Sequence, residues 1–216
     1  MNQVDIGLFK FDYDVTWMGF FLDAEDHILS RYGGRDDKSA DARLSVAGLK
    51  HTMREVLKIH KQVRPPETHT PLVAQDLSRN KGKGCMHCHQ VWEGLRKREK
   101  DEKRFDPESL YIYPPPEKLG LELDVTVGAK IVKVLPGSAA ERAGLRAGDV
   151  LVSIDQVSIY SQGDVFWALQ NAPVDGKLPL QYRREGKVES ATLELPRGWR
   201  KADLTWRPSM RKEKLK

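Results

Sequence analysis

The stretch Gly128-Ala-Lys-Ile-Val-Lys-Val-Leu-Pro-Gly-Ser-Ala-Ala-Glu-Arg-Ala-Gly-Leu-Arg-Ala-Gly-Asp-Val-Leu-Val-Ser-Ile-Asp155 has the clearest local pattern in this 216-residue chain. Its two ends are rich in aliphatic and β-branched residues, which predicts strands at Ala129–Leu135 and Asp149–Ile154. Pro136-Gly137 is a turn signal, and Ser138 can cap a short helix that runs to Ala143. The stretch therefore predicts a strand, a short helix, a turn and a second strand.

The residues around this stretch continue the same pattern. Pro114-Pro-Pro116 marks a boundary before it, and Asp175-Gly176 and Glu185-Gly186 mark turns after it. Ser161 and Asp164 form a start similar to a capping box for a longer helix. The further strands that we expect are Leu119–Val125, Leu178–Arg183 and Val188–Leu195.

This order of elements resembles a PDZ domain of the bacterial protease-associated type, over residues 117–196. The resemblance implies an α+β, mainly β fold, a small β-barrel capped by two helices. It also implies binding of an extended peptide or a protein C-terminus as an added strand in a groove. Leu119-Gly120-Leu121 matches the family's carboxylate-binding loop. On this interpretation Leu121 and Leu123 line the strand side of the groove, and Val165 and Leu169 the helix side; the alternative is that some of these four fill the core.

Residues 1–63 predict a hairpin and a helix. The apolar run Val15–Leu22 and the stretch His27–Tyr32 read as two strands, and Ser45 can cap the helix that follows. Val46, Leu49, Met53, Val56 and Leu57 trace one face of that helix, which predicts that this face is buried.

Phe20-Phe-Leu-Asp23 and Arg31-Tyr-Gly-Gly34 are similar to the C-terminal half of thioredoxin-like proteins. The resemblance is partial, because that family's Cys-x-x-Cys and the proline before its hairpin are both missing here. Thioredoxin chemistry is therefore assigned to no residue of this segment.

Cys85-Met86-His87-Cys88-His89 contains both cysteines of the chain, within a region 64–116 that reads as linker followed by a helix. Its spacing matches the attachment signature of c-type cytochromes, in which two thiols bind haem c and the adjoining histidine, here His89, binds the iron. Two rival interpretations are a redox dithiol and a metal site, and a structural disulfide or idle thiols is the third alternative. Met53, His60, His69 and Met210 are all conceivable second ligands of the iron.

The net charge of +5 belongs to the tail, because residues 197–216 carry eight Lys or Arg and two Asp or Glu. This tail could contact an anionic surface, although a solvated end is the simpler interpretation, and we expect no DNA partner. Trp199 and Trp206 are expected to fold back over an apolar edge of the PDZ-like module. No apolar run is long enough to span a membrane, and no signal peptide is visible.

No Gly-x-Ser-x-Gly or His-Glu-x-x-His motif occurs, so the sequence favours a binding protein over a hydrolase. The leading hypothesis is a scaffold or adaptor whose PDZ module binds a partner and whose Cys85–His89 segment attaches haem c for redox sensing or electron transfer. The alternatives are a thiol-disulfide oxidoreductase that uses Cys85 and Cys88 while the PDZ module selects substrate, or a metal-binding site. Haem attachment would imply a periplasmic or exported protein.

Overall fold

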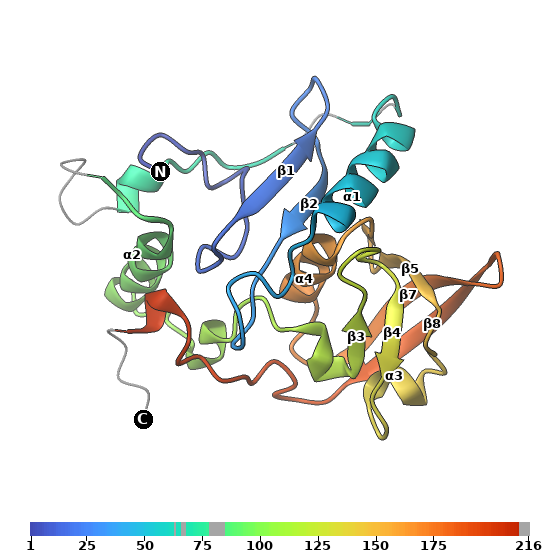
Figure 1. Cartoon of the computed structure of the whole chain (residues 1–216). Coiled ribbons are helices and arrows are strands. Elements are labelled where there is room, and N and C mark those ends of the chain that lie inside the picture. The colour runs from blue at the N-terminus through green and yellow to red at the C-terminus, as the bar shows by residue number, and fades with distance from the viewer. Residues whose placement is uncertain (63, 66–67, 78–84, 212–216) are drawn as a thin grey trace. The chain divides into compact units, whose positions relative to one another are not determined.

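The computed structural model in Figure 1 describes residues 1–62, 64–65, 68–77 and 85–211. The chain forms two compact units, and each is built from segments that are distant in sequence. Unit 1 comprises Met1–Val15, Glu67–Tyr111 and Ala202–Lys216, and unit 2 comprises Thr16–Pro66 and Ile112–Lys201.

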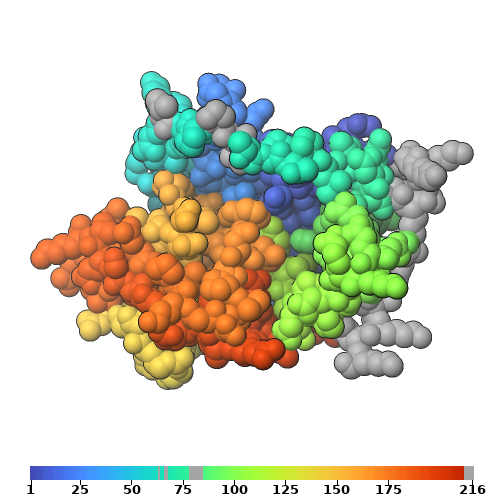
Figure 2. All heavy atoms as spheres, turned by 180° about the vertical axis from the view of Figure 1, so that it is seen from behind, coloured from blue at the N-terminus to red at the C-terminus, as the bar shows by residue number. Residues whose placement is uncertain are grey.

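Unit 2 contains the PDZ-like module as two small antiparallel sheets. One sheet pairs β3 (Leu121–Leu123) with β4 (Ile131–Val134). The other has the strand order β6 (Val157–Ser158), β5 (Val150–Ile154), β7 (Gly176–Arg184) and β8 (Lys187–Leu195). A single bridge between Lys130 and Val150 connects them, and the described residues form no closed barrel, which corrects the expected barrel. The long β7–β8 hairpin forms the orange projection in Figure 2.

The predicted strands and helices of this module are confirmed, apart from short shifts at their ends and the two-residue β6, which was not predicted. Its helices are α3 (Ala139–Arg142) and α4 (Gln162–Asn171), whose N-caps are the predicted Ser138 and Ser161. The core between the sheets and α4 includes side chains that are at most 2% exposed, which are Leu119, Leu121, Ile131, Leu151, Ile154, Val165, Leu169, Leu178, Leu180 and Leu193.

A hairpin from the N-terminal region covers α4 on a second side. It consists of β1 (Met18–Leu22) and β2 (Ile28–Gly33), which pair as a two-stranded antiparallel sheet. The Ser30 hydroxyl and the Arg31 backbone N–H both donate to the Asp164 carboxylate, at 2.7 and 2.8 Å, and the Ser161 hydroxyl donates to the Arg31 carbonyl. The hairpin is therefore an extension of the PDZ-like module, and this arrangement does not support the thioredoxin resemblance.

The helix α1 (Val46–Ile59) begins at the predicted cap Ser45, but of the predicted apolar face only Val56 is buried. Gly48, Thr52 and Val56 are buried, whereas Val46, Met53 and Leu57 are 69%, 46% and 65% exposed. The cause is the close approach of Gly48 to the chain after β3, where an added Cβ would lie 2.3 Å from the Val125 carbonyl oxygen. Backbone proximity thus outweighs burial of the larger side chains.

Unit 1 contains α2 (Cys88–Asp101) and three single-turn helices, η1 (Ala74–Leu77), η2 (Pro107–Leu110) and η4 (Pro208–Met210). Its apolar cluster is small and centres on five buried residues: Ile6, Tyr13, Ala74, Met86 and Val91. The described residues contain no helix long and apolar enough to cross a membrane.

The basic tail is largely integrated into the fold as far as residue 211. In unit 1 Arg207 is 3% exposed, and its guanidinium donates to both carboxylate oxygens of Asp12 at 2.8 Å and to Asp14 at 3.3 Å. Trp199 lies in the core of unit 2, as predicted, whereas Trp206 belongs to unit 1, where its ring contacts Arg207. Arg207 is therefore unavailable to an anionic surface, and the tail's last residues, 212–216, lie outside the described residues.

Candidate functional site

The predicted carboxylate-binding loop lies where the one-turn helix η3 (Pro116–Leu119) meets β3. Gly120 ends η3 in the left-handed region, with φ 89°, and its N–H donates to the Glu117 carbonyl at 3.0 Å. An added Cβ at Gly120 would lie 2.1 Å from Ser138 Cβ, so both the conformation and the space require glycine. The loop therefore has a fixed shape that delivers Leu121 to the start of β3.

Among the described residues, no strand pairs with the second edge of β3, which we call its open edge. Its neighbour β4 occupies the other edge, with Leu121 opposite Val134 and Glu122 opposite Lys133. In an antiparallel strand, alternate residues direct their backbone groups to opposite edges, so Leu121 and Leu123 address the open one. An extended peptide could hydrogen-bond to this edge.

The helix α4 lies beside this edge. The Gln162 side-chain amide donates to the carbonyls of Leu123, at 3.4 Å, and Asp124, at 3.0 Å. Phe166 and Leu169 follow Gln162 by four and seven residues and so share its side of the helix. The open edge of β3 and this side of α4 (Gln162, Phe166 and Leu169) form the candidate site for a peptide, which we call the peptide-binding face.

The side chains predicted to line the groove are all deeply buried. Leu121, Val165 and Leu169 are 0% exposed, Leu119 is 1% and Leu123 is 5% exposed, and all five belong to the core cluster of unit 2. Sequence reasoning missed Gln162 and Phe166, because it sought only aliphatic residues on the helix. The helical spacing of Gln162 and Phe166 from Leu169 could have indicated that all three residues share one side of the helix.

The peptide-binding face is itself contacted by residues that precede α1. The Arg43 guanidinium donates to Glu117 at 2.7 Å and to Gln162 at 3.4 Å, and it lies 5.6 Å from the centre of the Phe166 ring. The Ser45 hydroxyl donates to the Val125 carbonyl, just beyond β3, at 2.9 Å. Nothing in the sequence between Gly34 and Ser45 indicated these contacts.

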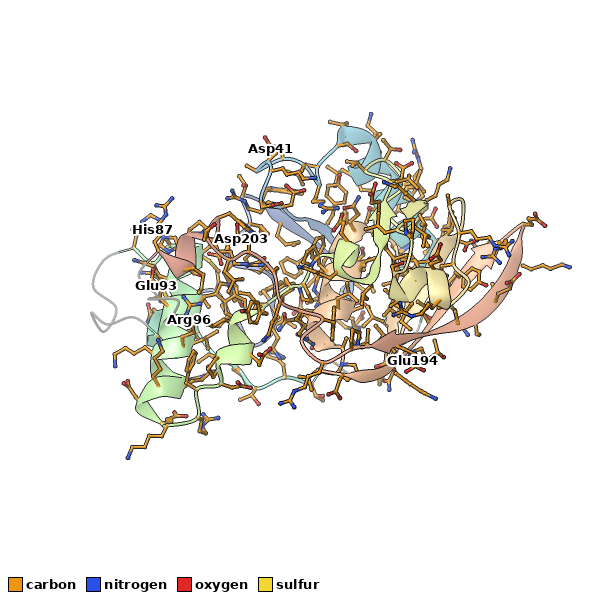
Figure 3. All side chains as sticks on the ribbon, turned by 90° about the horizontal axis from the view of Figure 1, so that it is seen from below. Asp41, His87, Glu93, Arg96, Glu194 and Asp203 are labelled. Atoms are coloured by element: carbon orange, nitrogen blue, oxygen red, sulfur yellow. The ribbon has the colours of Figure 1, made fainter. Side chains whose placement is uncertain are left out.

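The Cys85–His89 motif lies in unit 1, at the start of α2. Both thiols are free, with Cys85 exposed and Cys88 partly buried against the apolar cluster. His89 Nδ1 lies 3.3 Å from Glu93 Oε1, and the His87 and His89 rings are stacked with centroids 6.0 Å apart. Figure 3 labels His87 and Glu93 at this end of α2. The motif thus presents a partly exposed imidazole whose Nδ1 is next to a carboxylate.

Within the described residues, a group of three potential metal ligands occurs elsewhere, at Asp23, Glu25 and His27. His27 Nδ1 lies 2.8 Å from Asp23 Oδ2, and its Nε2 lies 2.7 Å from the Pro65 carbonyl oxygen. Both ring nitrogens are thus in structural contacts. Cys85–His89 forms no such three-ligand group among the described residues.

The comparisons with known proteins concern the PDZ-like region. A family model for the PDZ domain matches residues 96–195. The periplasmic serine endoprotease DegP of Escherichia coli (strain K12) is 37% identical over 75 residues, which are 35% of this chain and 16% of that protein. The probable serine protease do-like of Buchnera aphidicola is 33% identical over 75 residues, with the same two shares. The serine protease Do-like HtrA of Lactococcus lactis is 32% identical over 78 residues, which are 36% of this chain and 19% of that protein.

Among solved structures, an HtrA-type protease with a decapeptide has a TM-score of 0.30 and 25% identity, over 38% of this chain and 25% of that chain. The chain spans less than a fifth of the length of each of the three curated relatives. The similarity therefore concerns one region of those proteins and does not extend to the whole of them. Residues 96–195 contain a PDZ domain that is homologous to the PDZ regions of DegP and HtrA proteases.

Proposed function

We propose that unit 2 binds the C-terminal segment of a partner protein as an added strand along the open edge of β3. The observation that carries this proposal is the left-handed turn at Gly120, which leads directly into a strand with one edge that no other strand of the described part of the chain pairs with. Two relatives, DegP of Escherichia coli and a DegP-like protein of Marinomonas sp., are described as periplasmic serine endoproteases. We therefore also propose a periplasmic or exported location, where the PDZ domain serves a scaffold or adaptor.

The recognition follows from backbone chemistry. An added antiparallel strand would exchange hydrogen bonds with Leu121 and Leu123, and the peptide's carboxylate would lie at the Leu119–Leu121 turn. Hydrogen bonds from N–H groups to a charged carboxylate are stronger than those to a neutral amide. The proposal thus predicts that the free carboxylate contributes more to the affinity than any single side chain of the ligand does.

The test is a library of peptides with free C-termini, followed by fluorescence anisotropy of the best binder and its C-terminally amidated twin. We expect amidation to weaken binding about tenfold or more, which corresponds to about 1.4 kcal/mol. Gly120→Ala should abolish binding, because its Cβ would meet Ser138. Gly137→Ala is the matched control, since Gly137 also has positive φ but no atom within 4 Å of the added Cβ. Equal binding of the two peptides, or of the two variants, would contradict the proposal.

A second candidate function is attachment of haem c at Cys85 and Cys88, with His89 as the iron ligand. Its support is the contact of His89 Nδ1 with Glu93, because metal-bound histidines commonly donate their other ring N–H to a carboxylate. The two thiols are free, and Cys88 and Trp92 lie against the apolar cluster of unit 1. A bound haem would supply a one-electron redox couple. A redox dithiol and a metal site at Cys85–His89 are the competing interpretations.

An absorption spectrum of protein produced in a host that matures c-type cytochromes separates these alternatives. Covalent haem gives a Soret band that survives acid–acetone extraction, and Cys88→Ser should reduce the retained haem strongly. Glu93→Gln should keep the attachment but alter the iron's reduction potential, since it changes the partner of His89. Absence of a Soret band would leave the redox dithiol and the metal site as interpretations. Thiol titration before and after oxidation detects the dithiol, and elemental analysis detects a bound metal.

A further inference from the structure

The peptide-binding face is contacted on both of its walls by one segment of the same chain, Gly34–Ser45. This segment connects β2 to α1, and Figure 3 labels Asp41 within it. At one wall Arg43 lies against Gln162 and Phe166 of α4, and at the other Ser45 binds the Val125 carbonyl just beyond β3. The segment therefore joins the two walls between which a ligand strand would insert.

Burial agrees with this position. Phe166 lies on the side of α4 that faces β3, where a ligand side chain would contact it, yet it is 8% exposed. A Cβ added at Gly34 would lie 3.8 Å from Phe166 Cε2, so the backbone of the segment passes next to this ring. The Arg43 side chain is 9% exposed and fills the space between Phe166 and Glu117.

The ion pair that holds Arg43 is incompletely satisfied. Arg43 Nε and Glu117 Oε2 are both buried and have no hydrogen-bond partner among the described residues, although Arg43 Nη2 donates to Glu117 Oε1 at 2.7 Å. Buried polar atoms without partners are destabilising relative to the same atoms in water. Exposure to water would relieve this cost, so the contact is well suited to opening.

We propose that Gly34–Ser45 is an intramolecular cover of the peptide-binding face, held by Arg43, and that a peptide binds only when the cover is displaced. This proposal rests on the proposed peptide-binding function and adds its regulation. Since only the uncovered fraction of molecules can bind, the apparent affinity is reduced by that fraction. Weakening the Arg43 contact should therefore tighten peptide binding without any change in the ligand.

The test compares the wild-type chain with Arg43→Met, which keeps the aliphatic stem and removes the guanidinium. Lys38→Met is the matched control, because Lys38 is an exposed cation of the same segment. We expect Arg43→Met to bind the best library peptide about tenfold more tightly than the wild type does. This factor corresponds to a cover that is closed in about nine of ten wild-type molecules. Lys38→Met should bind like the wild type. Hydrogen exchange of residues 34–45 in the wild type should accelerate when the peptide is added.

Equal affinity of the wild type and Arg43→Met, or unchanged exchange of residues 34–45 at saturating peptide, overturns the cover. If no peptide binds to any variant although Arg43→Met releases the segment in hydrogen exchange, the peptide-binding function itself fails and the cover fails with it. Glu117→Gln weakens the same ion pair from the other side and should also tighten binding. It replaces Arg43→Met if circular dichroism shows that the latter is unfolded.

Discussion

At the scale of single residues, Asp164 connects α4 to the β1–β2 hairpin through a deeply buried carboxylate. It is 2% exposed and accepts hydrogen bonds from Ser30 and from the backbone N–H groups of Arg31 and Tyr160. Burial raises its pKa from 3.8 to about 6, although these hydrogen bonds oppose the increase. The carboxyl group is therefore protonated more readily in the folded protein than in the unfolded chain.

The consequence is a pH dependence of the free energy of unfolding. Because the folded-state pKa lies above the unfolded value, this group's contribution is complete below about pH 4 and is lost as the pH rises through about 6. A shift of this size corresponds to a loss of about 3 kcal/mol. Urea unfolding between pH 4 and pH 8 should show this decline in the wild type and a flatter profile in Asp164→Asn. Identical pH profiles for the two proteins would contradict the assignment.

The sequence predicted residues whose roles are local and missed those whose partners are remote. Ser45, Ser138 and Ser161 were recognised as caps, because a cap bonds to backbone within its own first turn. Asp164 was recognised as part of the start of its helix, yet its bond to Ser30 joins residues 134 positions apart. No local pattern encodes such a pairing.

At the scale of elements, α1 shows how a helix can be predicted correctly and oriented wrongly. Its periodicity indicated a buried apolar stripe, but of that stripe only Val56 is buried, and it shares the buried face with Gly48 and Thr52. The Gly48 N–H donates to the Ser45 hydroxyl at 2.9 Å, and an added Cβ would lie 2.9 Å from the Tyr32 hydroxyl as well as 2.3 Å from Val125 O. The spacing of apolar residues predicts a helix well, but it does not indicate how closely two backbone segments approach each other.

This orientation reverses the usual effect of a glycine substitution. In an exposed helix interior, Gly→Ala stabilises by roughly 1 kcal/mol, whereas the clash at Gly48 should make Gly48→Ala destabilising by about 1–3 kcal/mol. Ala47→Gly, at the exposed neighbouring position, should cost up to about 1 kcal/mol. Thermal unfolding of both variants shows whether each substitution raises or lowers the stability of the protein. Stabilisation by Gly48→Ala would show that the predicted apolar face, and not this one, is buried.

At the scale of the whole molecule, the PDZ domain was predictable because its strands, turns and helices follow each other closely in sequence. The two units were not, since each combines segments from opposite parts of the chain. The tail illustrates this most clearly. Its charge run indicated a solvated end, yet Arg207 is buried with Asp12, 195 residues away. Charge composition reports how many cations a segment has and carries no information about a distant carboxylate.

Arg207 should therefore be a main determinant of the stability of unit 1, whose apolar cluster is small. Burial raises the pKa of Asp12, and the Arg207 charge opposes this increase, so Arg207 favours the ionised form of a buried carboxyl group. Arg207→Met leaves this carboxylate and Asp14 without their cation, and breaking a buried pair in this way costs about 3–5 kcal/mol. Hydrogen exchange in residues 1–15 and in α2 should accelerate strongly. Arg211→Met, which removes an exposed cation of the same tail, should change stability by no more than about 0.5 kcal/mol. Equal hydrogen-exchange protection of unit 1 in Arg207→Met and Arg211→Met would mean that the tail adds only net charge and does not stabilise unit 1, as its composition first indicated.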